Sequence, residues 1–88
     1  MNLTQSTNDQ LMATAAHRYC LGRRSYIVSA CIEWIKDTWA DFSEGTRDVM
    51  IRETGHALEH GEAGDGCDFR MWRAALNWME GDRENINA

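Results

Sequence analysis

One segment of the chain indicates its fold more directly than any other. From His17 to Ile35 the sequence reads HRYCLGRRSYIVSACIEWI: an apolar helix-forming stretch, a glycine, two arginines and a serine, then a second apolar stretch. Glycine is the residue most often found directly after a helix, and so short a connection makes the two helices neighbours. The segment predicts a helical hairpin that turns at Gly22 and displays arginines at its corner.

The rest of the chain favours helices as well. Proline is absent from the 88 residues, and helix-forming residues are frequent. Apolar residues recur at spacings of three and four in four segments. We therefore predict an all-α fold, a compact bundle of four short helices that form one domain at 9–80, with a flexible tail at 1–8 and a polar tail at 81–88. The expected helices span about 9–21, 26–41, 46–60 and 69–80.

Each predicted helix carries an apolar face that we expect to lie in the core. The inward residues expected for the first helix are Leu11, Met12, Ala15, Ala16, Tyr19 and Cys20. Those of the second, central helix are Val28, Cys31, Ile32, Ile35, Trp39 and Phe42, with a break at Thr38 as an alternative end. The later helices are expected to bury Val49, Met50, Thr54, Ala57 and Leu58, and then Phe69, Trp72, Leu76 and Met79. Ser25, Ser43 and Asp68 are the predicted N-terminal caps, and Gly22, Gly61 and Gly81 the predicted stops.

Composition limits the classes of function. The hydrophobic content of 43% supports a core, and the net charge is −5 although arginine dominates the basic residues. Three cysteines, an odd number without paired spacing, predict buried thiols rather than a disulfide framework. The chain shows neither an apolar run long enough to cross a bilayer nor a signal peptide. These observations predict a cytoplasmic protein that has no membrane partner.

Several side chains have the spacing of a chemical site without the rest of its pattern. His56 and His60 lie four residues apart, as zinc ligands do, but the H-E-x-x-H pattern is missing. The acidic loop 61–68 lacks the alternating ligands of a calcium loop. Cys20 lies near His17, yet on the apolar face of its helix. We therefore expect no catalytic, metal or cofactor residues, and a protein that is not an enzyme.

Two surfaces are the candidate partner-binding sites. The first is the corner formed by Arg23, Arg24 and Tyr26, since arginine and aromatic side chains often carry interface energy. The second is the acidic loop, which contributes Glu62, Asp65 and Asp68, with Trp78 beside it. Two alternatives remain: a small regulatory module that contacts nucleic acid through the Arg23/Arg24 corner, which the acidic charge disfavours, and a homodimer held by Trp78.

The string RYCLGRRSYIVSACIEWI resembles a pattern shared by small phage and prophage proteins, R-Y-x-L-G-R-x-[ST]-Y followed by an aliphatic helix with tryptophan. The matching residues are Arg18, Tyr19, Leu21, Gly22, Arg23, Ser25 and Tyr26. The resemblance implies an accessory protein of a mobile element, a class that includes host-takeover factors and anti-CRISPR inhibitors. It therefore implies a host protein as partner, with a CRISPR effector subunit or a nuclease as candidates, and an acidic surface that mimics nucleic acid as one mechanism of inhibition.

Overall fold

A computed structural model gives the fold, and it describes the backbone of residues 3–87 and the side chains of residues 9–82. Four α-helices follow one another along the chain: α1 (Leu3–Cys20), α2 (Ser25–Thr38), α3 (Glu44–Glu59) and α4 (Gly66–Asn87). A short 3-10 helix, η1 (Trp39–Asp41), joins α2 to α3. The predicted all-α four-helix architecture is confirmed, and the described residues contain no strand.

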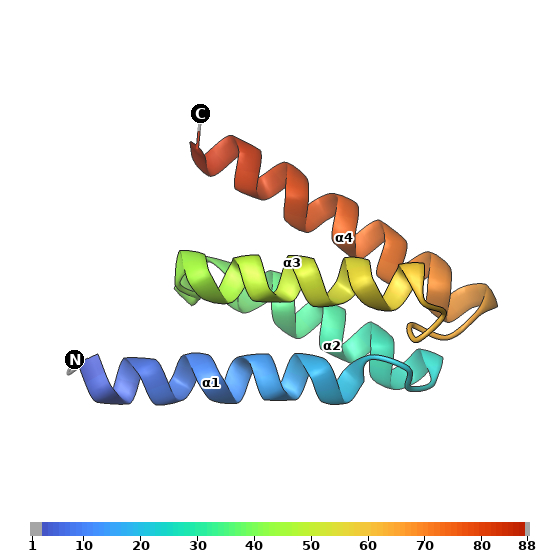
Figure 1. Cartoon of the computed structure of the whole chain (residues 1–88), viewed down its shortest axis with the longest axis horizontal. Coiled ribbons are helices and arrows are strands. Elements are labelled where there is room, and N and C mark those ends of the chain that lie inside the picture. Colours follow the sequence, from blue (N-terminus) through green and yellow to red (C-terminus); the bar gives the residue numbers. More distant parts are fainter. Residues whose placement is uncertain (1–2, 88) are drawn as a thin grey trace.

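Each helix packs mainly on two neighbours: α1 contacts α2 and α3, and α4 contacts the same two helices. Figure 1 shows α1 and α3 running side by side, whereas α4 meets α3 at one end of the bundle and diverges from it toward the C-terminus. The α1–α2 turn and the α3–α4 loop lie together at the end where α3 and α4 meet.

The core is built from the apolar faces of α2, α3 and α4 as the sequence predicted. Trp72, Ile35, Met50, Met79 and Val28 are its largest fully buried apolar side chains. Trp39 is also buried, and its ring packs edge-to-face on Phe42 and Trp78 at 6.1 and 5.6 Å between centroids. Aromatic pairs in this geometry add to the stability that their buried area provides.

Helix ends follow the expected chemistry at three of the six predicted positions: Gly22, Ser43 and Gly61. Gly22 and Gly61 have φ angles of +79° and +71°, which glycine tolerates best. The Ser43 side chain accepts the Thr46 N–H at 3.1 Å and so caps α3. The central helix α2 ends at Thr38, which was the predicted alternative to an end near residue 41. Arg47 reaches back to the carbonyls of Trp39 and Ala40, at 2.9 and 3.1 Å, where backbone groups at the end of a helical segment need donors.

The outer bounds of the first and last helices differ from the prediction. α1 begins at Leu3 rather than near residue 9, and α4 continues to Asn87 rather than ending near residue 80. Residues 3–8 and 81–87, predicted as tails, thus fall within helices, while residues 1, 2 and 88 lie outside the described residues. Gly81 does not stop α4 because its backbone lacks the positive φ that ends a helix.

The face that α1 turns inward also differs from the prediction. Ala13 and His17 are buried, whereas Leu11, Met12 and Tyr19 are 61–70% exposed. Polar side chains on this face form hydrogen bonds to other segments, although His17 Nδ1 forms none. Gln10 accepts the Ser43 N–H at 2.8 Å, and His17 shares a hydrogen bond with Thr54 at 2.8 Å. Satisfied polar groups can occupy a core, so the most apolar face of α1 is not the one that packs.

Candidate functional site

The two surfaces singled out in the sequence meet at one end of the bundle. Ser25 Oγ donates a 2.7 Å hydrogen bond to Asp68 Oδ1, which ties the start of α2 to the start of α4. Gly22 lies so close to the α3–α4 loop that an added Cβ would stand 3.0 Å from the Glu62 carbonyl oxygen. Arg23, Arg24, Tyr26, Glu62 and Asp65 are exposed around this junction, and we call these five residues the end face.

The cationic part of the end face is partly ordered by local contacts. Arg23 Nε donates to the Tyr19 carbonyl at 2.9 Å, and its guanidinium lies 4.3 Å from the centre of the Tyr19 ring. A cation–π contact of this kind holds a flexible side chain in one place. Arg24 occupies the N-cap position of α2 with an extended backbone. Tyr26 is 74% exposed, so aromatic and cationic groups stand together in solvent.

Two caps predicted in this region are wrong. Ser25 is the first residue of α2 rather than its cap, and its hydroxyl is engaged by Asp68. Asp68 lies inside the first turn of α4, which begins at Gly66. An acidic side chain in the first turn still favours the helix, because it faces the positive end of the helix dipole.

Trp78 is not beside the acidic loop. It lies on α4 ten residues beyond Asp68, and a helix rises about 15 Å over that length. Its ring packs on Trp39 at 5.6 Å, with the Lys36 ammonium 5.5 Å from the ring centre. The sequence could not predict this packing. A tryptophan at the edge of an apolar helical stripe can either pack in the core or lie exposed on the surface, and its position in the pattern does not distinguish the two.

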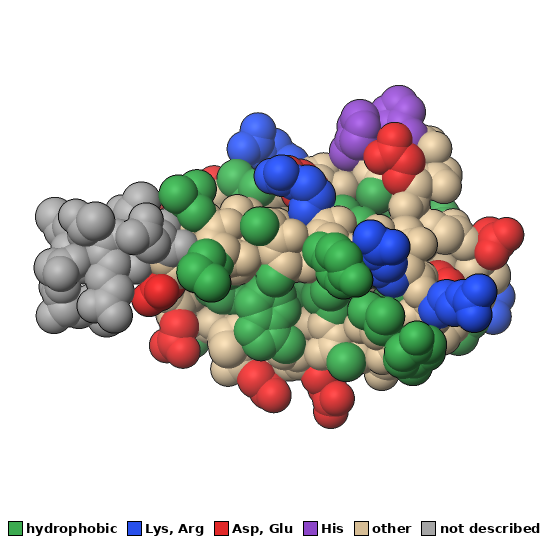
Figure 2. Space-filling model, turned by 90° about the horizontal axis from the view of Figure 1, so that it is seen from below, with side chains coloured by type: hydrophobic (Ala, Val, Ile, Leu, Met, Phe, Trp, Pro, Cys, Tyr) green, Lys and Arg blue, Asp and Glu red, His purple; other side chains and the backbone are tan. Residues whose placement is uncertain are grey.

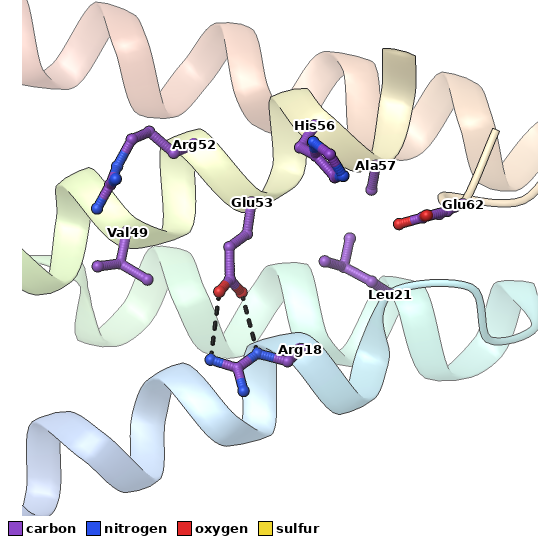
Figure 3. A pocket seen from close by; sticks show the side chains of 8 residues that line it. All are labelled: Arg18, Leu21, Val49, Arg52, Glu53, His56, Ala57 and Glu62. Carbon is purple, nitrogen blue, oxygen red and sulfur yellow. Dashed lines mark hydrogen bonds and ion pairs between the residues drawn. The ribbon is translucent and has the colours of Figure 1, made fainter. Parts of the chain in front are cut away.

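A groove of about 560 Å³ opens beside the end face, between α1 and α3. Figure 3 shows its mixed charges, in which Arg18 of α1 and Glu53 of α3 point toward each other across the opening. Their ion pair joins Arg18 Nη2 to Glu53 Oε1 at 3.2 Å, and Arg18 Nε to Oε2 at 3.4 Å. The residues that line it are Arg18, Leu21, Val49, Arg52, Glu53, His56, Ala57 and Glu62.

A buried polar contact under this groove escaped the sequence analysis. His17, which the sequence did not place in the core, is fully buried. Its ring packs edge-to-face on Trp72 with 5.5 Å between centroids, and Nε2 shares the 2.8 Å hydrogen bond with Thr54. Burial lowers the His17 pKa to about 4; Glu53, whose nearest oxygen is 3.9 Å from Nδ1, opposes that shift only in part, and Arg18 adds to it. The ring is therefore neutral at pH 7 and joins three helices.

The remaining groups weighed in the sequence are scattered. Cys31 is buried. Burial is the main cause that raises the pKa of its thiol, and a hydrogen bond with Cys20 raises it further. Cys67 is exposed in the first turn of α4, so the prediction of buried thiols is wrong for this cysteine. His56 and His60 stack at 4.2 Å between ring centroids. Over the described part of the chain, no three His, Cys, Asp or Glu side chains converge as metal ligands.

A second surface feature is the apolar stripe of α1: Leu11, Met12, Ala15, Ala16 and Tyr19, all of them exposed. Figure 2 shows the α1 side of the molecule, where hydrophobic side chains cover the middle of the face. Acidic side chains lie along its lower left edge and at its right end, and basic ones lie at its upper edge and toward its right. Large exposed apolar patches are often binding sites, so this stripe is a second candidate contact surface.

Comparison with known proteins assigns no function to these surfaces. No family model matches the chain, and no curated protein or solved structure matches it either. Among the described residues, none of the helices has both the length and the apolar character that a membrane crossing requires.

Proposed function

We propose that this chain is a non-enzymatic interaction protein of phage origin that binds and blocks a host protein in the host cytoplasm. The observation that carries the proposal is the junction of the two predicted surfaces into the end face. Because the Ser25–Asp68 hydrogen bond ties the corner to the loop region, arginine, tyrosine and acidic side chains are presented together on a rigid support. Such a mixture of aromatic anchors and charges suits protein recognition.

The resemblance of the hairpin to phage accessory proteins supports a host target concerned with defence. We propose a CRISPR effector subunit or a nuclease as the target class. Enzymes that hold nucleic acid present basic grooves, and Glu62 and Asp65 offer exposed negative charge next to Tyr26.

The first experiment measures inhibition in cells. A bacterium whose CRISPR system restricts a phage is made to express the protein, and plaque formation is counted. We expect plaques to increase with the wild-type protein and not with Arg24→Ala/Tyr26→Ala. The matched control is Arg73→Ala/Asn77→Ala, two exposed residues of α4 away from the end face, and it should act as wild type. No increase in plaques across several CRISPR types would count against the anti-CRISPR target class.

Affinity capture then identifies the target. The tagged wild type should retain one host protein from a lysate in a stoichiometric amount, and so should the α4 control. The Arg24→Ala/Tyr26→Ala variant should not retain this protein. If all three variants retain the same proteins, the end face is not the binding surface.

One observation favours nucleic acid as a second candidate partner. Tyr19 and Tyr26 are exposed on either side of Arg23 and Arg24, and aromatic rings beside arginines can stack single-stranded bases. Electrophoretic shift of a generic single-stranded DNA at low salt tests it. A shift that Arg23→Ala/Arg24→Ala abolishes would support this alternative, and the absence of a shift would reject it.

A further inference from the structure

The outward apolar stripe of α1 borders a groove that matches part of the chain itself. This groove of about 600 Å³ runs between α1 and the α2–η1 segment. Its apolar lining includes Met12, Ala16, Trp34 and Phe42, and Asp9 and Asp41 stand at its rim. The groove therefore suits an apolar side chain that has a positive charge beside it, because the lining is apolar and the rim is acidic.

The other end of α1 presents such a pair of side chains. Tyr19 is 61% exposed, and the Arg23 guanidinium lies on its ring and bonds to its carbonyl. The two residues therefore form a preordered aromatic–cationic unit. Groove and unit occupy opposite ends of α1, so one molecule cannot bring its own unit into its own groove.

We propose that the α1 face is the interface of a two-fold symmetric homodimer in which α1 packs antiparallel to α1 of a second copy. Arg23 lies beyond the end of α1, and its guanidinium is held on the Tyr19 ring. Ala15 lies near the midpoint between Asp9 and Tyr19, so an antiparallel pair centred there brings the Arg23 charge of one protomer near Asp9 of its partner. The same operation seats Tyr19 in the partner's groove. A two-fold interface needs this self-complementarity, because every contact occurs twice.

The surface that such a dimer requires is a modest part of the molecule. A standard interface covers about 800 Å² per partner, about a seventh of the 5731 Å² accessible surface of this molecule. The small side chains of Ala15 and Ala16 allow the two helices to approach closely at the crossing point, as helix pairs do at interaxial distances of about 8–10 Å. The inference shares only Arg23 with the end face, and it leaves Arg24, Tyr26 and the acidic loop on the outside of the dimer for the host target.

Charge exchange tests the arrangement directly. The full chain is studied by sedimentation equilibrium across a range of concentrations, with circular dichroism to confirm folding. We expect wild type to dimerise, and Asp9→Arg or Arg23→Asp to raise the dimer dissociation constant about tenfold or more, because each creates two like-charge contacts. The matched control, Glu80→Arg, changes an exposed residue of α4, which packs mainly on α2 and α3, and it should dimerise as wild type.

The decisive step is to mix the two charge variants. One protomer of the mixed pair then carries arginine at both positions, and its partner carries aspartate at both, so the two charge contacts are attractive. The mixture of D9R and R23D should therefore form a heterodimer although neither variant dimerises well alone. The double variant Asp9→Arg/Arg23→Asp should regain the homodimer. A wild-type chain that stays monomeric at every concentration would overturn the proposal, as would charge variants that dimerise like wild type or fail to complement each other.

Discussion

At the scale of single residues, His17 is the side chain whose structural role is least evident from its residue type. A histidine between arginine and alanine on a short helix is typical of a solvated, partly charged side chain. Here it is enclosed by Thr54 and Trp72 instead. The hydrogen bond makes a neutral ring acceptable in the core, and a protonated ring would bring a charge there that Glu53, 3.9 Å from Nδ1, offsets only in part.

We therefore expect folding stability to depend on pH through His17. The pKa is about 4 in the folded chain and about 6.5 when unfolded, so the unfolded chain binds the proton more readily. The free energy of unfolding has its full value above about pH 6.5, where the His17 ring is neutral in both states. It decreases as the pH falls from about 6.5 toward 4. Between pH 7.5 and 5.0 the free energy of unfolding should drop by about 2 kcal/mol, measured by urea unfolding at one low protein concentration.

Two controls separate this effect from other titrations. His56→Gln, which alters an exposed histidine, should leave the pH dependence intact, whereas His17→Gln should remove most of it. The imidazole resonances of wild type give a second measurement that needs no variant. A His17 ring that titrates near 6.5 in the folded protein would contradict the prediction.

At the scale of the elements, two glycines of similar sequence context have opposite roles. Gly22 follows α1 at φ +79° and touches the backbone of the α3–α4 loop. Gly81 lies within α4, with no atom within 4 Å of an added Cβ and no positive φ. Both were predicted as helix stops, and only the first is one.

Alanine substitutions should separate these roles. Gly22→Ala is expected to lower the free energy of unfolding by about 2 kcal/mol or more, because alanine resists the left-handed backbone and its Cβ meets the Glu62 carbonyl. Gly81→Ala should raise it by up to about 1 kcal/mol, because alanine favours a helix interior. Urea unfolding of both variants checks the pair. Equal effects of the two substitutions would mean that α4 ends at Gly81 after all.

At the scale of the whole molecule, the proposed dimer links stability to concentration. A partner that binds only the folded chain stabilises it by mass action. We therefore expect the thermal midpoint of wild type to rise as protein concentration increases. The midpoint of Asp9→Arg should stay nearly constant over the same range, and differential scanning calorimetry measures both. A wild-type midpoint that does not move would agree with a monomer.

The sequence alone determined the four helices, the turn at Gly22 and the inward faces of α2, α3 and α4. These follow from local periodicity and from strongly apolar stripes, which have one favourable way to leave water. It also identified Arg23, Arg24 and Tyr26 as exposed, because charges and a corner keep them in solvent. The pattern could not say that Trp78 packs on Trp39, since that contact joins helices far apart in the chain.

Only the tertiary structure decided which face of α1 is buried, and with it which surface is free for a partner. The choice depends on hydrogen bonds across helices, from Gln10 to the Ser43 region and from His17 to Thr54. Such bonds let a less apolar face pack inward, and periodicity carries no record of them. The same long-range contacts brought the arginine corner and the acidic loop to one end of the molecule.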